Sequence, residues 1–207
     1  MKKSNDAGIP SQELGNEVTV EYSIVASSRA AARSIYKDAV IRLFNVNEWH
    51  LLTGSALSIF QLTDQAGNSI DRSCVMVNDY LRINIPAFGS TAGDGDDWVK
   101  VEMIDSQQDI AGLEHSTTMR VRPTPNPLHP QTGTAHFFDE RATSTFRVAQ
   151  KGLCITAAVY GRNEISNTDS PSVIDNVRNA VIAIGAQLGG SRIQWKSLAK
   201  GIIDGSN

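Results

Sequence analysis

The chain has 207 residues, enough for one domain with a hydrophobic core of its own. Its hydrophobic fraction of 41% and charged fraction of 20% are those of an ordinary globular protein, and no run approaches the roughly 18 apolar residues of a membrane span. The net charge of −3, with basic residues scattered among acids, argues against a nucleic-acid surface. Two cysteines, Cys74 and Cys154, are too few for a disulfide framework, so we expect a cytoplasmic protein.

The first quarter of the chain predicts a strand followed by two helical segments. Val18 to Ile24 alternates apolar and polar side chains, which is typical of a half-buried strand. Serines 27–28 offer an N-cap for a helix over Arg29 to Phe44, where apolar residues recur at four-residue spacing. Glu48 to Leu52 then predicts a short second helical element.

From Ala56 onward the periodicity is that of strands. Strands that follow one another without crossovers pair in the antiparallel sense. The proline-rich stretch from Pro123 to Pro130 interrupts the series, because proline cannot donate a hydrogen bond inside a sheet. The strand-like segments that follow the two helical elements, about six or seven, are Leu57–Phe60, Val75–Val77, Tyr80–Ile85, Trp98–Met103, Ser116–Val121, Thr143–Ala149 and Cys154–Tyr160.

The last fifty residues predict a long amphipathic helix over Pro171 to Leu188. Ser170 caps it, and apolar residues recur every three or four positions. After Gly189 and Gly190, Arg192 to Ile203 forms a short continuation. The long helix must place its apolar stripe on the sheet, which leaves a space for a pocket between the two layers.

The predicted fold class is therefore α+β, with a curved antiparallel sheet gripping a long C-terminal helix and two short helices after the first strand. In this element order, in Val18–Ala26, in the helix from Ser28 and in the pair Glu48-Trp49, the chain resembles the START/Bet v 1-like superfamily, also called SRPBCC or helix-grip. The resemblance covers Glu17 to Leu188. It implies a cavity-forming protein, since members include lipid and sterol carriers, plant hormone binders and polyketide cyclases.

We expect one domain over residues 17–203, preceded by a flexible N-terminus at 1–16. The chain departs from the family pattern in a proline-rich insert at 123–131 and in a C-terminal extension at 189–207. Either segment could cap a cavity mouth, extend the fold or mediate association.

The first functional hypothesis is binding of a small hydrophobic molecule, lipid-like, polyketide-like or aromatic, with no cofactor. Sequence cannot determine which strand face points inward, and Trp49 is more simply a core residue. If Leu81 and Ile83 face the helix, Arg82 lies on the solvent side, which is favoured because an unpaired buried charge is costly. The candidate wall residues are Trp49, Phe60, Tyr80, Trp98, Phe146, Tyr160 and Ile184.

Two other hypotheses stay open. A cyclase, hydratase or hydrolase in the same cavity would need an acid–base group, for which His50, His115 and Asp79 are the candidates. An interaction or regulatory module would use the proline-rich stretch and the C-terminal tail. We expect a small apolar molecule as partner and no nucleic acid, and association into a homodimer is left open.

Two polar clusters lack the spacing of a metal site, and solvated loop residues are the favoured interpretation of both. The first cluster comprises His129, His136, Asp139 and Glu140, and the second Asp94, Asp96 and Asp97.

Overall fold

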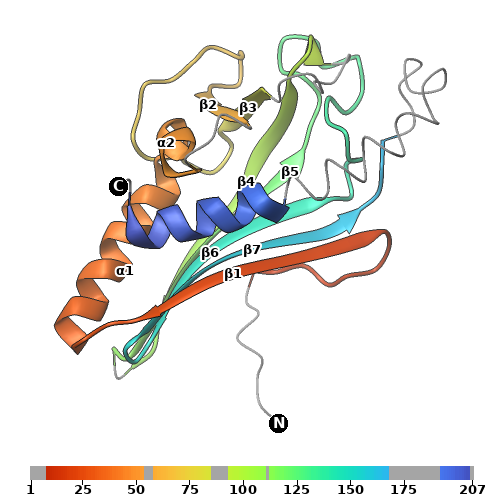
Figure 1. Ribbon diagram of the computed structural model, residues 1–207. Helices are drawn as coiled ribbons and strands as arrows, with labels where there is room; N and C mark the ends of the chain where they lie inside the picture. Colours follow the sequence, from red (N-terminus) through yellow and green to blue (C-terminus); the bar gives the residue numbers. More distant parts are fainter. Residues whose placement is uncertain (1–7, 54–57, 85–92, 111, 168–191, 206–207) are drawn as a thin grey trace.

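The computed structural model describes residues 8–53, 58–84, 93–110, 112–167 and 192–205. One antiparallel sheet of seven strands, in the order β1-β7-β6-β5-β4-β3-β2, carries helices on a single face (Figure 1). This arrangement confirms the predicted α+β helix-grip fold. The elements are β1 (Asn16–Val25), α1 (Arg29–Phe44), the single turn η1 (Val46–Glu48), α2 (Trp49–Thr53), β2 (Ile59–Thr63), β3 (Tyr80–Asn84), β4 (Asp97–Gln108), β5 (Glu114–Pro123), β6 (Thr143–Lys151) and β7 (Cys154–Glu164).

Helix α1 begins where the sequence predicts. The hydroxyl of Ser28 accepts a hydrogen bond of 3.1 Å from the backbone N–H of Ala31, which satisfies one of the donors left free at a helix start. Ala32, Ala39 and Leu43 form its buried stripe. This cap and these small apolar residues explain why a helix forms here and which side of it meets the sheet.

Strand register divides the sheet into two chemically different faces. On the face that carries the helices, here called the inner face, Phe146 of β6 pairs with Met119 of β5 and Val159 of β7, and all three are buried. Leu81 and Ile83 of β3 belong to the same buried cluster. Arg82 lies on the opposite, outer face, within 3.7 Å of Asp96, as the cost of an unpaired buried charge predicts.

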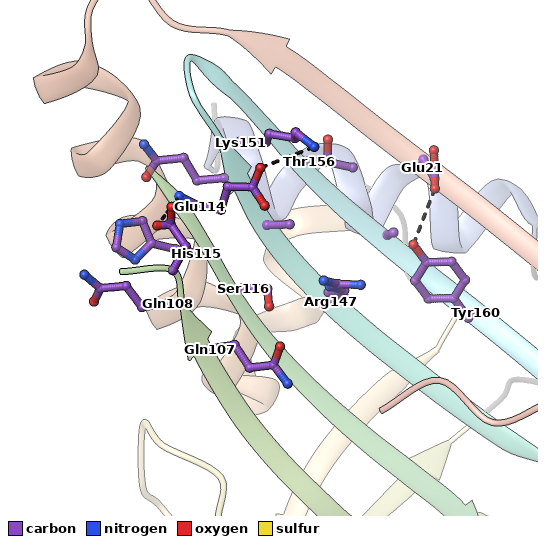
Figure 2. A pocket seen from close by; sticks show the side chains of 14 residues that line it. Glu21, Gln107, Gln108, Glu114, His115, Ser116, Arg147, Lys151, Thr156 and Tyr160 are labelled. Carbon is purple, nitrogen blue, oxygen red and sulfur yellow. Dashed lines mark hydrogen bonds and ion pairs between the residues drawn. The ribbon is translucent and has the colours of Figure 1, made fainter. Parts of the chain in front are cut away.

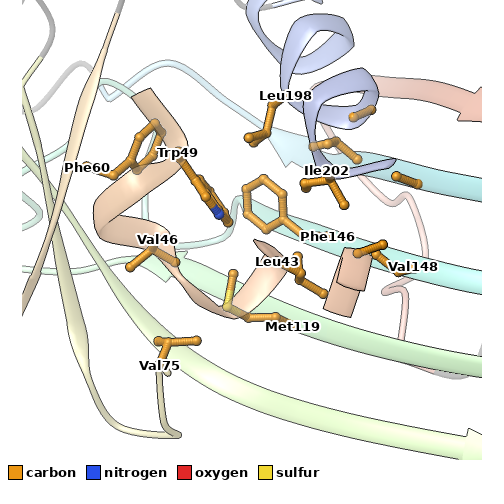
Figure 3. Packing of buried hydrophobic residues seen from close by; sticks show 14 of the residues in the cluster. Leu43, Val46, Trp49, Phe60, Val75, Met119, Phe146, Val148, Leu198 and Ile202 are labelled. Atoms are coloured by element: carbon orange, nitrogen blue, oxygen red, sulfur yellow. The ribbon is translucent and has the colours of Figure 1, made fainter. Parts of the chain in front are cut away.

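A C-terminal helix at residues 192–204 lies across the inner face. Its buried hydrophobic residues are Leu198, Ala199, Ile202 and Ile203, and Figure 3 shows Leu198 and Ile202 directed at Phe146. The sequence predicts this segment only as a short continuation within an extension, yet it supplies part of the core. The predicted long helix Pro171–Leu188, and Ile184 with it, lie outside the described residues.

Two loop regions add detail to the sequence-based picture. Val75–Val77 is not a strand: Val75 is buried and donates its N–H to the carbonyl of Phe44 at 3.1 Å, while Met76 and Val77 are exposed. The chain after Pro123 returns to the sheet, where the N–H of Trp98 donates to the carbonyl of Ala135 at 2.7 Å. Within the described ranges, no helix has the length and hydropathy needed to cross a membrane.

Candidate functional site

Three of the predicted wall residues lie on the inner side of the sheet. The Trp49 ring centroid lies 5.1 Å from that of Phe60 and 4.8 Å from that of Phe146. All three side chains are buried, and Trp195 of helix 192–204 packs edge-on against Phe146 with ring centroids 5.5 Å apart. Aromatic rings in such contact stabilise the core, and these residues belong to the core between the sheet and the helices.

Three other predicted wall residues lie on the outer face. Tyr80 pairs with Lys100, whose ammonium lies 5.8 Å from the ring centroid. Trp98 pairs with Arg82 across the same two strands. Tyr160 pairs with Thr145, and its hydroxyl reaches a carboxylate oxygen of Glu21 at 3.4 Å. Register therefore separates Tyr80, Trp98 and Tyr160 from the inner cluster.

The acid–base candidates from sequence do not gather at one place. His50 is exposed, with Nδ1 2.9 Å from the carbonyl oxygen of Asn47. Asp79 forms an ion pair with Arg72. His115 is buried, with its ring centroid 5.5 Å from that of Tyr36. Among the described residues, no three His, Cys, Asp or Glu side chains are grouped as a metal would require.

A different acid, Glu164, occupies the inner face at the end of β7. A Cβ atom built on Gly161 would overlap Oε1 of Glu164, so the carboxyl lies over that glycine. Gly161 points to the inner face because it alternates with the buried Val159 and pairs with Ser144. We call the group formed by Val121, Ser144, Gly161 and Glu164 the Glu164 site.

Glu164 is only 6% exposed, and its Oε2 accepts no hydrogen bond from the residues that the structure describes. Burial raises the pKa of the Glu164 carboxyl to about 7, because the charged form loses its hydration. The positive charges of Arg162 and Arg192 oppose this rise without cancelling it. The carboxyl therefore takes up or releases its proton near neutral pH.

Simple strand alternation does not predict the inward position of Glu164. Counting in twos from Val159 and Gly161 would put residue 164 on the outer face. Asn163 has a left-handed backbone with φ of 56°, and the pairing of β1 with β7 shifts register between Asn16 and Val18. This irregularity turns the carboxyl inward, and no sequence motif signals it.

The outer face carries a separate open groove of about 420 Å³ (Figure 2). Its floor is a cross-strand row of small residues, Ser116, Ala149 and Thr156, on three adjacent strands. Larger side chains two positions away along β6, Arg147 and Lys151, stand on either side of that row. Figure 2 shows the groove on the side of the sheet turned away from helix 192–204. This groove is polar and chemically unlike the Glu164 site.

A buried histidine holds the loop after β5 against the sheet. Nδ1 of His136 accepts the N–H of Phe138 at 2.9 Å, and its Nε2 lies 3.8 Å from a carboxylate oxygen of Asp97. Burial lowers the pKa of His136 to about 3, so the ring is neutral at physiological pH. Since one ring nitrogen is already engaged and both groups are buried, this pair has a structural role in anchoring the loop.

Comparison with known proteins yields distant overlaps only. No protein-family model matches the chain. No curated protein matches it either. The KanY protein overlaps 91% of this chain and 99% of its own, with a TM-score of 0.44 and 8% identity. A protein of Thermus thermophilus overlaps 93% and 100%, with a TM-score of 0.42 and 14% identity.

The Zhui aromatase/cyclase of Streptomyces sp. R1128 overlaps 90% of this chain and 94% of its own, with a TM-score of 0.41 and 7% identity. Overlaps at this level carry no functional information. The topology itself is informative, because one antiparallel sheet of seven strands holds its helices on one face and two helical elements follow the first strand. This is the architecture of a helix-grip fold.

Proposed function

We propose that the protein binds a small molecule with an apolar body and one hydrogen-bonding group, in the layer between the sheet and the helices. The observation that carries this proposal is the buried carboxyl of Glu164, whose Oε2 is unsatisfied within the described part of the chain. Leaving a buried polar group unpaired costs about 1 to 3 kcal/mol. A core selected for stability alone would place an apolar side chain there, so the carboxyl points to a ligand.

The surroundings of Glu164 fit such a ligand. Ser144 keeps partial exposure on the inner face, although its strand neighbours Phe146 on β6, Val121 on β5 and Gly161 on β7 are buried. Ser144 is therefore a partly exposed position on the inner face, one strand away from Gly161 and its neighbouring carboxyl. An apolar body placed there would meet Val121 and Phe146, while its polar group reached Glu164.

The ligand class follows from this balance of contacts. Shape and apolar area would supply most of the affinity, as in small-molecule sites generally, and one carboxyl would set the orientation. A lipid-like, polyketide-like or aromatic molecule with a hydroxyl or carbonyl group meets these requirements. Among the three wall residues on the inner side, Phe146 is the one that adjoins Ser144 along β6.

The experiment first identifies any bound molecule and then tests whether filling the proposed site with a larger side chain prevents binding. Native mass spectrometry of the purified protein, followed by denaturing extraction, would identify any bound molecule. Titration with naphthol, followed through tryptophan fluorescence, would then compare Ser144→Phe, which fills the inner space, with Ala149→Trp, which fills the outer groove on the same strand. Naphthol affinity reduced at least tenfold by S144F and kept by A149W is the expected result. Equal affinities in all three proteins would overturn the proposal.

The interaction-module hypothesis receives less support from the contacts. Thr124 and Ala135 hydrogen-bond to Trp98 and to each other, so both ends of this stretch are tied to the sheet and only 128–133 are exposed. A homodimer and the absence of nucleic-acid binding stay predictions.

A further inference from the structure

We propose that Glu164 is a general base, and that its substrates are apolar molecules carrying a C–H bond acidified by a neighbouring carbonyl group. This inference rests on the proposed ligand site and adds an activity to it. It concerns a residue that none of the sequence motifs singles out.

The placement of the carboxyl carries the inference. A carboxylate in water is a weak base because hydration stabilises its charge, and removal from water makes it a stronger one. Glu164 is more than nine-tenths buried, and the inner face around it is formed by Val121, Phe146 and Gly161. Oε1 lies over Gly161, while Oε2 is the oxygen left without a partner in the described chain. Because Oε2 has no hydrogen-bond partner among the described residues, it is the oxygen to which we assign the substrate proton.

The charged groups around the carboxyl are arranged for this task. Arg162 on β7 and Arg192 on helix 192–204 both act on Glu164, yet neither lies within ion-pair distance of its carboxylate. Arg162 is instead engaged by the carbonyl of Val18, at 3.0 Å, and by Glu17 at 3.9 Å. Because burial raises the pKa of Glu164 to about 7, both protonation states are populated near neutral pH, which is the range in which a base both accepts and returns a proton.

The proposed step is a proton shift with no external reactant. Ionised Oε2 takes the proton from the carbon next to the carbonyl, and the electron pair of that C–H bond moves to form a carbon–carbon double bond as the carbonyl oxygen becomes negative. The proton, now on Glu164, is then delivered to that oxygen or to another carbon of the same molecule. Substrate and product are isomers, and the carboxylate is regenerated.

The test uses a probe that reports on buried carboxylates. Nitrobenzisoxazole is a flat apolar molecule that opens when a base removes its ring C–H proton: the electron pair forms a nitrile, the N–O bond breaks, and a coloured cyanonitrophenolate is released. Purified full-length protein is expected to accelerate this reaction, with a rate that rises through about pH 7 as Glu164 ionises. Glu164→Gln is expected to lower kcat/KM at least about 100-fold, the lower end of what a general base contributes.

Controls separate this inference from the proposed binding site. Ala149→Trp, in the outer groove, should leave the rate unchanged, and Glu164→Asp should retain part of it with a shifted pH profile. Probe binding detected by tryptophan fluorescence, with equal rates in wild type and E164Q, would overturn the general base and leave the ligand site standing. No binding of the probe and none of naphthol would overturn both.

Discussion

Removal of the ionisable group at residue 164 is expected to change the pH dependence of stability. In the folded protein the pKa of Glu164 is about 7, against 4.5 in the unfolded chain. The folded state therefore binds this proton more tightly, and the resulting stability is fully present below pH 4.5 and is lost as pH rises through 7. A shift of about 2.5 units corresponds to about 3 kcal/mol of unfolding free energy.

Glu164→Gln keeps the size and the polar character of the side chain but cannot ionise. Its unfolding free energy relative to wild type should rise by about 3 kcal/mol between pH 4.5 and pH 8.5. Because Glu164 is 6% exposed, solvent screening reduces this value little. Groups that titrate identically in both proteins cancel in the difference.

Urea unfolding at intervals of half a pH unit provides the measurement, with the slope against urea concentration checked for constancy. Two parallel stability curves over this range would show that the carboxyl is hydrated in the folded protein. That outcome would refute the buried Glu164 site, and with it the basis for a ligand anchored there.

Three further predictions concern the packing around the site. Protonation of buried His136 opposes folding, so wild type should lose stability as pH falls from 6.5 towards 3, and His136→Phe should flatten that slope in urea unfolding. In the same assay, Ile202→Ala should lower the unfolding free energy by about 2 to 5 kcal/mol, because Ile202 is buried. Ile193 is 65% exposed, so Ile193→Ala should lower it by at most about 0.5 kcal/mol. Similar losses in the two variants would contradict the placement of helix 192–204. Gly161→Ala should displace the carboxyl of Glu164 and move its pKa back towards the ordinary value, measurable by carboxyl carbon NMR; an unchanged pKa would mean that the carboxyl does not lie over this glycine.

Local patterns were sufficient to predict most of the described elements of this fold. Three of these patterns act over only a few neighbouring residues: the Ser28 cap, the four-residue spacing of α1 and the two-residue alternation of β1. They can therefore be recognised without knowledge of the rest of the chain. The antiparallel pairing followed from strands in unbroken succession. The strand prediction failed where alternation was short, at Val75–Val77, which is a loop held to α1 through Val75.

The candidate site could not be obtained in this way, because the face that a residue occupies depends on register. One set of aromatic residues was divided between two surfaces: Phe146 lies inside, and Tyr80 and Tyr160 lie outside. Helix 192–204 carries only a short apolar stripe in sequence, and only its contact with the sheet makes it part of the core.

Glu164 is the clearest example of a residue whose position the sequence could not predict. Composition and periodicity determined that the chain folds as an antiparallel sheet with helices on one side. Tertiary structure alone decided that a left-handed residue, Asn163, and a shifted pairing with β1 turn a carboxyl into the apolar layer. The reason is physical: strand propensity depends on neighbouring residues, whereas the burial of a charge depends on every element that folds over it.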